Sequence, residues 1–410
     1  MSVNAKNRNP EAMDVLDKPE KGTTTTAIQP PSRLVSAPPG ASRIDRIEVE
    51  RYRLPLDPAF PPAWDSRPRS HFDATILRVT TADGAVGIGA GTGMEGFEDY
   101  RDLFIGEDPL DIERHHAVLS NIDFHAGRPW PLELALWDLA GKIKSQPVWR
   151  LLGGKSGVVP CYASTGVLRD SRAQVDKVCE LRDKGFPAVK IRFHRADWRE
   201  DVRALEAVRR AVGDKVEILV DCNQGWRMPW DTEPCWNYHQ ALVVARELER
   251  LGVYWMEEPL HRCDWRGMSV LHNAVSVRIA GGEMTREPSM LEDLIERRCV
   301  DVLQPDASLT CGIAGAMRLA RRAADAGVAF TPHTWGNGIG LLANAHLFAG
   351  CQGGPWLEYP IDPPEWTPKR RDFMLAEPVK ADKKGCIALP ETPGLGIALD
   401  EARLEKLRVG

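Results

Sequence analysis

Hydrophobic and polar positions follow two different rhythms along this chain. Residues 44–50 alternate with a period of two, residues 75–79 do so less cleanly, and Asp83-Gly84 predicts a turn before another strand. We therefore predict a small antiparallel sheet, with a proline-rich loop over residues 54–72 between its first strands. Helical patterns follow at 109–122 and 131–142. Together these elements predict an α+β domain spanning residues 42–156.

From Val158 onward, short apolar runs alternate with amphipathic helical stretches such as 198–212 and 238–251. This rhythm is typical of a closed parallel barrel, which we place at residues 157–358. An open doubly wound sheet would normally carry a phosphate-binding glycine loop after its first strand, and the sequence has none. The segment 359–410 loses the rhythm, and we expect it to pack on the first domain. The predicted strands are 158–164, 187–193, 216–221, 252–257, 277–283, 300–305, 327–332 and 355–358.

Composition narrows the class of protein. Residues 1–41 are polar and proline-rich, so we expect a disordered tail. The net charge of −5 gives no reason to expect nucleic-acid binding, and no apolar run approaches the length of a membrane span. The nine cysteines form no CxxC pair, which is typical of a reduced, cytoplasmic protein.

Three carboxylates, Asp221, Glu257 and Glu283, follow three successive predicted strands. The C-terminal ends of parallel neighbours meet on one rim of the sheet, so we expect these side chains to lie close together. Three like charges would repel each other unless a cation lies among them. Oxygen ligands alone suit a hard ion, and we predict Mg²⁺.

Further polar residues follow other strands. Strand alternation places Lys190, Arg192 and His194 on one side, toward the barrel axis. Asp306 and His333 end consecutive strands, so their side chains can meet. A carboxylate that accepts a hydrogen bond from one imidazole nitrogen makes the other nitrogen a better base. Asn223 and Glu358 complete the predicted rim; each has the alternative of capping a neighbouring element.

These pieces together resemble the enolase superfamily, in its mandelate racemase subgroup, from about residue 42 to the end of the chain. The resemblance rests on a set of short motifs found in the family's order. They are Leu136-Trp137-Asp138-Leu139-Ala140-Gly141-Lys142, Leu151-Leu152-Gly153-Gly154, Asp221-Cys222-Asn223-Gln224, Glu257-Glu258-Pro259, Gly282-Glu283, Pro305-Asp306 and His333. The implied fold is a modified TIM barrel of the (β/α)7β type with an α+β capping domain.

The resemblance also implies roles for residues. Asp221, Glu257 and Glu283 would bind Mg²⁺, and Asp306 with His333 would form the base dyad that removes a proton next to a carboxylate. Glu358 would hydrogen-bond the substrate carboxylate. Lys190 matches the first lysine of the family's KxK motif; the second lysine is replaced by Arg192.

That replacement favours one reaction. A racemase needs a base on each face of the carbanion, and a guanidinium is a poor proton acceptor. We therefore predict an acid-sugar dehydratase, a hydro-lyase that gives a 2-keto-3-deoxy acid. His333 or His194 would be the acid that assists loss of the hydroxyl. The alternatives are a racemase or epimerase using Lys190 or His194 as second base, and a non-catalytic relic of the fold.

The resemblance to the mandelate racemase subgroup also predicts which residues surround the site. In this family a lid from the small domain covers the pocket, which would bring Trp64 and His71 to the substrate. The stretch 226–238 could form another wall of the pocket. Glu258 is expected to make a structural salt bridge, and His194 has the alternative of simple packing. The partners implied are a small-molecule carboxylate and further copies of the chain, from a dimer to an octamer.

Overall fold

The computed structural model describes residues 42–409, so the expectation for residues 1–41 lies outside the described part. An antiparallel sheet with the order β13-β1-β2-β3 begins the fold. Its strands are β1 (Ile44–Phe60), β2 (Arg69–Thr81), β3 (Val86–Gly91) and β13 (Arg408–Val409). The turn at Asp83-Gly84 joins β2 to β3, as the sequence predicted.

The proline-rich loop predicted at residues 54–72 is wrong for most of its length. The β1–β2 pairing continues from Leu54 opposite Phe72 to Phe60 opposite Arg69, with an irregularity between. Among the described residues, β13 pairs with β1 only at Arg51 and Tyr52. Beyond this point β1 is an edge strand, where proline's missing N–H group is tolerated. The connecting loop is therefore confined to residues 61–68.

Helices of the first domain cover one face of this sheet. Gly87 and Gly89 on β3 allow a very close approach of the second long helix. A Cβ atom on these glycines would lie 2.2 Å from the Ala135 carbonyl oxygen and 2.0 Å from that of Pro131, respectively. Only glycine fits at such a distance. The helical elements are η1 (Phe97–Leu103), α1 (Ile112–His125), α2 (Trp130–Ile143) and α3 (Val148–Leu151).

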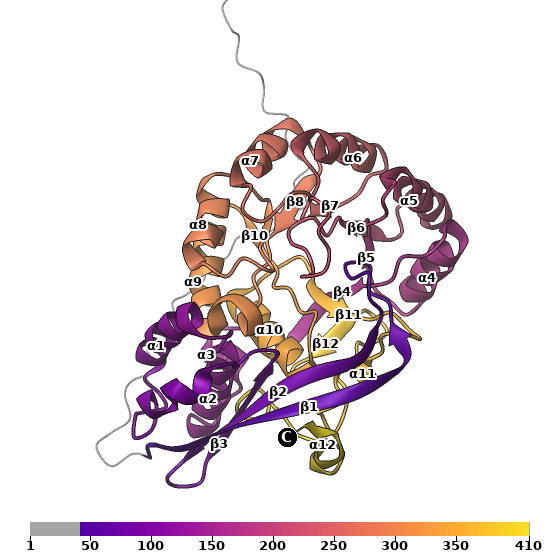
Figure 1. Ribbon diagram of the computed structural model, residues 1–410. Coiled ribbons are helices and arrows are strands. Elements are labelled where there is room, and N and C mark those ends of the chain that lie inside the picture. The colour runs from indigo at the N-terminus through magenta and orange to yellow at the C-terminus, as the bar shows by residue number, and fades with distance from the viewer. Residues whose placement is uncertain (1–41, 410) are drawn as a thin grey trace, which may run out of the picture.

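Eight parallel strands form the second sheet, which curls into a barrel (Figure 1). They are β4 (Val158–Ser164), β5 (Ala188–Arg192), β6 (Glu217–Asp221), β7 (Trp255–Glu257), β8 (Arg278–Gly281), β9 (Val302–Leu303), β10 (Ala329–Phe330) and β11 (Leu357–Pro360). β11 pairs with β4, and the gap to β10 is bridged by two contacts. The Gly354 amide donates to the Phe330 carbonyl at 3.2 Å, and the Thr331 hydroxyl donates to the Trp356 carbonyl at 2.5 Å.

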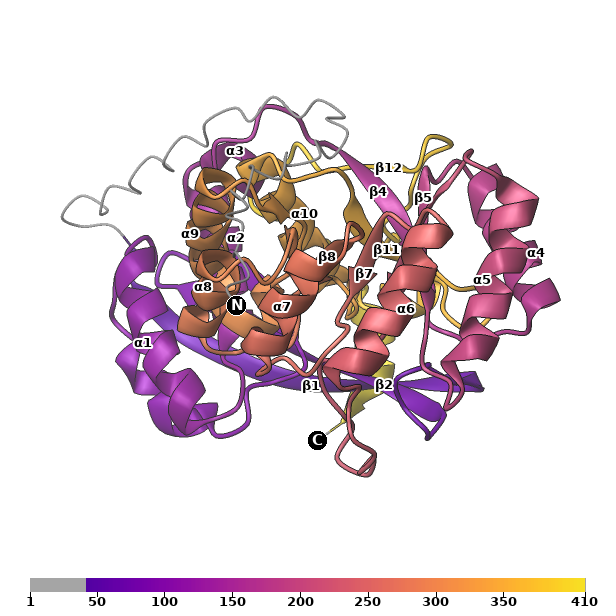
Figure 2. The ribbon, with the colours of Figure 1, turned by 90° about the horizontal axis from the view of Figure 1, so that it is seen from above.

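A helix follows each of the first seven barrel strands, and these helices ring the sheet in Figures 1 and 2. The predicted (β/α)7β barrel is thereby confirmed. Inside it, large side chains such as Tyr162, Leu219 and Trp255 pack together and fill the interior. The barrel is therefore a packed core, which leaves its strand ends to form a site. The helices are α4 (Ser171–Asp183), α5 (Trp198–Val212), α6 (Tyr238–Arg250), α7 (Trp265–Ala274), α8 (Pro288–Glu296), α9 (Gly312–Asp325) and α10 (Gly338–Cys351), with a π-helical turn η2 (Ala307–Cys311) before α9.

The C-terminal segment returns to both domains. It contains α11 (Pro368–Arg371), β12 (Cys386–Ala388) and α12 (Glu401–Leu407). β12 pairs with β4, β13 adds to β1, and the Leu395 amide donates to Asp138 on α2 at 2.7 Å. Figure 2 shows β1 and β2 lying across one end of the barrel. No described helix combines the length and apolar character that a membrane crossing requires.

Candidate metal centre and active site

Three buried carboxylates meet where β6, β7 and β8 end. Asp221 and Glu257 are the last residues of their strands and stand opposite each other in the pairing of β6 with β7. Glu283 lies just beyond the end of β8. Each residue offers one oxygen, and the three oxygens lie within 4.8 Å of one another. The structure thus brings together the three residues whose sequence positions predicted a metal site.

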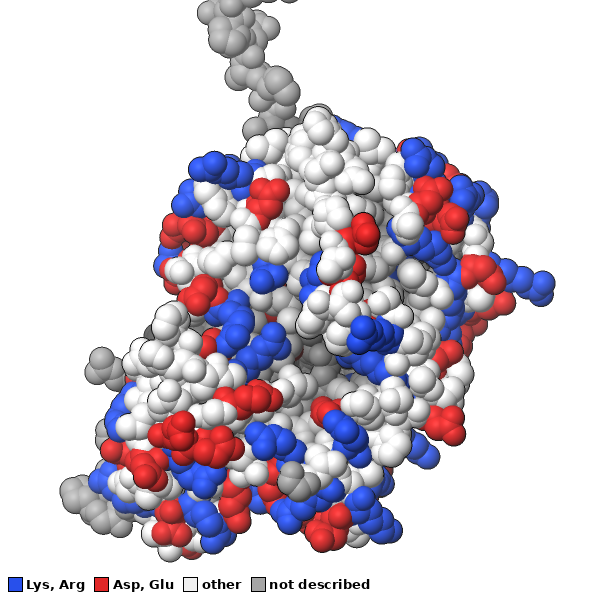
Figure 3. Space-filling model, in the orientation of Figure 1, with Lys and Arg blue, Asp and Glu red and all other residues white. Residues whose placement is uncertain are grey.

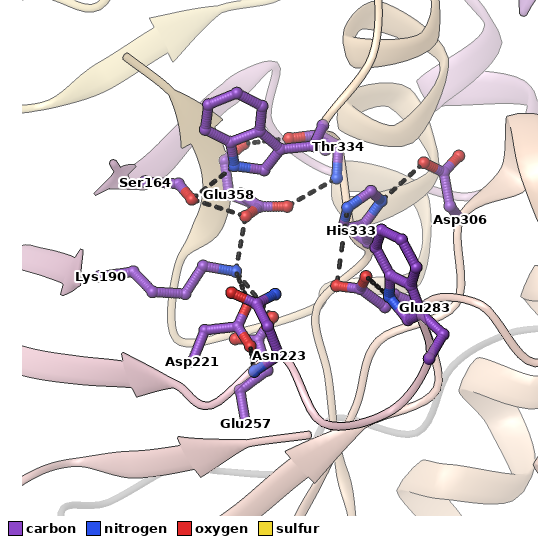
Figure 4. A network of polar contacts seen from close by, with 12 residues as sticks. Ser164, Lys190, Asp221, Asn223, Glu257, Glu283, Asp306, His333, Thr334 and Glu358 are labelled. Carbon is purple, nitrogen blue, oxygen red and sulfur yellow. Dashed lines mark hydrogen bonds and ion pairs between the residues drawn. The ribbon is translucent and has the colours of Figure 1, made fainter. Parts of the chain in front are cut away.

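Two cations lie directly against these carboxylates, and Figure 4 shows the first of them, Lys190. The Lys190 ammonium is 2.6 Å from Glu257, 2.7 Å from Glu358 and 3.7 Å from Asp221. Arg192 forms an ion pair with Asp221. Burial alone would lower the pKa of Lys190, but the surrounding carboxylates outweigh burial and raise it. Lys190 is therefore a permanent cation here.

The charges and the donor set fit a divalent cation. Within the described part of the chain, Asp221, Glu257 and Glu358 contact the cations Lys190 and Arg192, and Glu283 faces the imidazole of His333 at 3.6 Å. These four carboxylates outnumber the cationic groups beside them, which leaves an excess of negative charge. Burial raises the pKa of both Asp221 and Glu257, a sign that their charges are incompletely compensated. Carboxylate oxygens alone are the ligands that Mg²⁺ prefers.

Two indole N–H groups orient the metal-site carboxylates. Trp226 donates to the Oε1 atom of Glu283 at 3.0 Å, and Trp255 donates to the Oε2 atom of Glu257 at 3.1 Å. Such partners fix the direction of a ligand's remaining lone pairs. Sequence reasoning missed both roles. Trp255 could have been found, because it lies two residues before Glu257 and so shares its side of β7.

Asp306 and His333 form the predicted contact. The Nδ1 atom of His333 is 3.0 Å from the Oδ2 atom of Asp306, and its Nε2 atom is 3.6 Å from Glu283 (Figure 4). Burial would lower the pKa of His333, but Glu283, Glu358 and Asp306 outweigh it and raise the pKa to about 9. The imidazole thus has one nitrogen fixed by a carboxylate and the other directed at the metal site.

Asp306 is itself held rigidly. Its Oδ1 atom accepts hydrogen bonds from the Ser308 amide and hydroxyl, both at 2.7 Å, and from the Asn344 side chain at 2.9 Å. The π-helical turn η2 and helix α10 supply these donors. Sequence reasoning identified neither Ser308 nor Asn344, because the second reaches the site from 38 residues away along the chain.

Glu358 is fully buried and satisfied by protein groups. It accepts from the Ser164 hydroxyl at 2.8 Å and from the Thr334 amide at 2.7 Å, besides its ion pair with Lys190. Burial acts to raise its pKa, but Lys190, His333 and Arg192 outweigh burial and lower the pKa to about 2. Glu358 is absent from the described cavity lining, so the predicted contact with a substrate carboxylate stays a prediction.

A cavity of about 260 Å³ opens beside the metal triad and the dyad. Trp64 and His71 of the first domain line it, as the lid prediction required, and they face Asn223 and His333 of the barrel. The Oδ1 atom of Asn223 is buried without a hydrogen-bond partner among the described residues. No helix begins directly after Asn223, so the capping alternative is excluded and its free oxygen is available to a ligand.

Aromatic rings form much of the cavity wall. The Arg192 guanidinium lies 4.7 Å from the ring centre of Trp64 and 5.5 Å from that of Trp335. Trp64 and Trp335 also contact each other edge to face, with centroids 5.0 Å apart. Because Trp64 belongs to residues 61–68 and Arg192 ends β5, this contact joins the first domain to the barrel. Trp226 and Met228 add the wall predicted from the stretch 226–238.

Two predicted placements differ in the structure. His194 does not line the cavity; its Nδ1 atom is 3.4 Å from the Gln224 side chain, and burial lowers its pKa. β5 ends at Arg192, so strand alternation does not extend to His194. The salt bridge expected for Glu258 is wrong: no ion pair of this residue is present among residues 42–409, and burial holds its pKa well above the usual range.

Family models match most of the chain. One, described as "Enolase C-terminal domain-like", matches residues 173–403. The other, described as "Mandelate racemase / muconate lactonizing enzyme, N-terminal domain", matches residues 58–153. The two matches fall on the barrel with its returning segment and on the first domain.

Named proteins and solved structures agree with these models. An L-talarate/galactarate dehydratase from Salmonella typhimurium is 31% identical over 339 residues, covering 77% of this chain and 81% of the relative. An arabinonate dehydratase from Saccharolobus solfataricus is 30% identical over 287 residues, covering 68% of this chain and 71% of the relative. A racemase from Streptomyces coelicolor A3(2), solved with bound magnesium, superposes with a TM-score of 0.77 at 26% identity. The superposition covers 89% of this chain and 100% of the racemase.

Proposed function

Because the chain belongs to the mandelate racemase/muconate lactonizing enzyme family of the enolase superfamily, we propose that it is a Mg²⁺-dependent acid-sugar dehydratase. The reaction removes the proton next to the carboxylate and then the β-hydroxyl group. The product is a 2-keto-3-deoxy acid. Relatives named as dehydratases, such as the L-talarate/galactarate and arabinonate enzymes, support this class of reaction.

The observation that carries the proposal is the His333–Asp306 contact beside the metal triad. In the proposed roles, His333 removes the proton through its Nε2 atom while Asp306 holds the Nδ1 proton and keeps the ring oriented. The protonated ring then stands where it can return a proton to the leaving hydroxyl group. Asp221, Glu257 and Glu283 would hold Mg²⁺, which when bound supplies a Lewis acid that stabilises charge on the substrate's carboxylate oxygens.

The opposite wall of the site favours elimination over racemisation. Lys190 is locked between Glu257 and Glu358 with a raised pKa, so it is a poor proton acceptor. Arg192 is bound to Asp221 and lies against the rings of Trp64 and Trp335, and it stays charged. His194 lies off the cavity. These two cations can instead balance the negative charge that develops when the proton leaves.

Epimerisation is the second candidate, and one observation keeps it testable. His71 lines the cavity, and an imidazole there could act as a base from the side of the first domain. A racemase is also present among the similar structures.

The test is incubation of the Mg²⁺-loaded protein with a panel of acid sugars in deuterated buffer. A dehydratase gives a 2-keto product that reacts with semicarbazide. An epimerase gives α-deuterated starting material of both configurations and no keto acid. Failure to form keto acid from any member of the panel, with α-deuteration observed, contradicts the dehydratase proposal.

We also infer a homo-oligomer, between a dimer and an octamer, and a cytoplasmic location. Kinship supports the first inference, and the nine free cysteines support the second, because thiols stay reduced in the cytoplasm. Light scattering of the purified chain measures the first. A monomer at working concentrations contradicts it.

A further inference from the structure

One guanidinium on the cavity wall has no ion-pair partner among residues 42–409. Arg128 lies immediately before α2 in the first domain and faces the same cavity as His333. The other arginines of this cavity are neutralised: Arg192 by Asp221, and Arg69 by Asp65 at 3.3 Å. No ion pair or side-chain hydrogen bond of Arg128 is present within the described part of the chain.

The protein environment around Arg128 destabilises its charged guanidinium. Arg128 is half-buried, and burial together with the neighbouring Arg286 lowers its pKa. Arg286 already uses Asp123, which accepts its ion pair at 2.8 Å. The carboxylates of Asp306 and Glu95 act on Arg128 from a distance without contacting it. A partly desolvated guanidinium without a partner is destabilised, and an anion placed against it removes this cost.

The position of Arg128 is fixed by its backbone. A Cβ atom on Gly93 would lie 2.4 Å from the Arg128 carbonyl oxygen, so the loop after β3 packs directly against this residue. The preceding Gly127 amide donates to the Glu95 carbonyl at 2.8 Å. The backbone that carries the Arg128 side chain is therefore rigid. A rigid backbone favours specific recognition of a ligand group, whereas a flexible surface side chain does not.

Arg128 also stands at a boundary between two hollows. A second pocket of about 420 Å³ shares Arg128, Trp226 and Met284 with the cavity and adds three more arginines on its wall, Arg227, Arg262 and Arg286. Only one carboxylate residue, Glu287, lines it. Figure 3 shows Lys and Arg side chains beside a hollow near the middle of the displayed face. The outer pocket thus presents positive charge next to the inner cavity.

We propose that Arg128 binds a second anionic group of the substrate, at the end of the molecule away from the carboxylate that His333 and the metal triad address. The substrate class is a dianionic sugar acid, whose second anion is a carboxylate or a phosphate. This inference rests on the proposed dehydratase function for its reaction, but Arg128 binds the second anion whether or not the bound acid is turned over.

The first experiment compares matched substrates. It measures kcat/KM for hexaric acids, for the hexonic acids of the same configuration, and for the corresponding 6-phosphohexonic acids. We expect a preference for one dianionic series, and this comparison tells carboxylate from phosphate. In Arg128→Gln the preference over the hexonic acid falls roughly 10- to 100-fold, the usual value of a charged hydrogen bond. Arg128→Lys keeps the positive charge but lacks the paired N–H donors of the guanidinium, so the preference for the dianion should fall less than in Arg128→Gln.

A matched control removes the same charge outside both pockets. Arg266 is exposed and stacks on Trp265, and Arg266→Gln should leave the preference unchanged. The arginines of the outer pocket could instead attract anions only through their summed positive charge. In that case Arg128→Gln and Arg266→Gln reduce the preference for the dianion equally, and added salt abolishes the preference. That result, or an unchanged preference in Arg128→Gln, overturns the proposal. Melting temperatures confirm that the variants are folded.

A binding experiment separates this proposal from the function. Calorimetry with Mg²⁺ measures hexarate and 6-phosphohexonate binding to His333→Asn, alone and combined with Arg128→Gln. Weaker binding of the dianion in the double variant supports the Arg128 subsite even if the parent protein forms no keto acid. Keto-acid formation with identical dianion binding in both variants overturns the subsite and leaves the dehydratase function standing. Absence of any binding overturns the subsite.

Discussion

The Nδ1 atom of His333 lies 3.0 Å from the Oδ2 atom of Asp306, while the Nε2 atom of the same ring faces Glu283 at 3.6 Å. This arrangement ties the proposed base to its orienting carboxylate on one side and to the metal site on the other. It joins the ends of β9 and β10 to the end of β8. The proton-transfer and metal-binding parts of the site can therefore be tested separately.

Replacement of the base should stop the reaction and spare the metal site. We expect His333→Asn to lower kcat by roughly 10²- to 10⁴-fold, the usual contribution of a positioned general base. Calorimetric titration should show Mg²⁺ affinity within a few-fold of the parent. His239→Asn, an exposed histidine on α6, is the control and should turn over normally. Parental turnover by His333→Asn would show that another residue is the base.

Loss of the Asp306 charge should move the pH profile. Asp306 is one of the carboxylates that raise the pKa of His333 to about 9, so Asp306→Asn lowers that pKa. The imidazole then stays deprotonated to lower pH, and the acidic limb of the kcat/KM profile shifts downward while the maximum falls roughly 10²-fold. Asp325→Asn, an exposed residue at the end of α9, is the control. An upward shift of the limb would contradict the assigned contact.

Removal of one metal-site carboxylate should weaken Mg²⁺ binding. In Asp221→Asn the excess negative charge falls by one and an anionic ligand becomes a neutral amide, while Arg192 loses its ion pair. We expect the Mg²⁺ dissociation constant to rise at least roughly tenfold in a calorimetric titration. Asp214→Asn, on the exposed turn before β6, should bind as the parent does. Equal affinity in both variants would exclude Asp221 as a ligand.

A histidine far from the site should make the fold sensitive to acid. His346 on α10 is fully buried; it accepts from the Trp149 amide at 3.0 Å and contacts the Leu395 carbonyl at 3.2 Å. Burial lowers its pKa to about 3. Above the unfolded value of about 6.5 the ring is neutral in both states and costs nothing. Below it, only the unfolded chain takes up the proton, so stability falls by about 2 kcal/mol between pH 6.5 and pH 5.

Urea unfolding at pH 5 and at pH 7.5 measures this loss. His346→Gln can make both hydrogen bonds without titrating, so its stability should change less between the two pH values. If the parent and the variant lose the same free energy, His346 does not account for the acid sensitivity.

The residues at the strand ends of the barrel were predictable from the sequence, because parallel pairing of the strands determines which of these residues meet. Asp221, Glu257 and Glu283 each end an apolar run, and parallel pairing alone brings such positions together. The same reasoning placed Asp306 beside His333. It could not find Asn344 or Trp226, because their contacts depend on how a helix and a loop return to the rim.

The errors have a similar origin. His194 was placed on the axis by extending strand alternation past Arg192, where β5 has already ended. Pro55 was read as part of a loop, yet it lies in an edge segment of β1 where a missing N–H group is tolerated. Arg128 carries no sequence signal, because only the assembled domains show that it has no ion-pair partner in the described part of the chain.

The most direct test is a crystal structure of the protein soaked with magnesium. The account predicts one ion bound by oxygens of Asp221, Glu257 and Glu283 at about 2.0–2.1 Å, with the Nε2 atom of His333 directed at the same cavity. Carboxylates that keep their contacts with Lys190, Arg192, Trp226 and His333, with no shared ion at saturating magnesium, would contradict it.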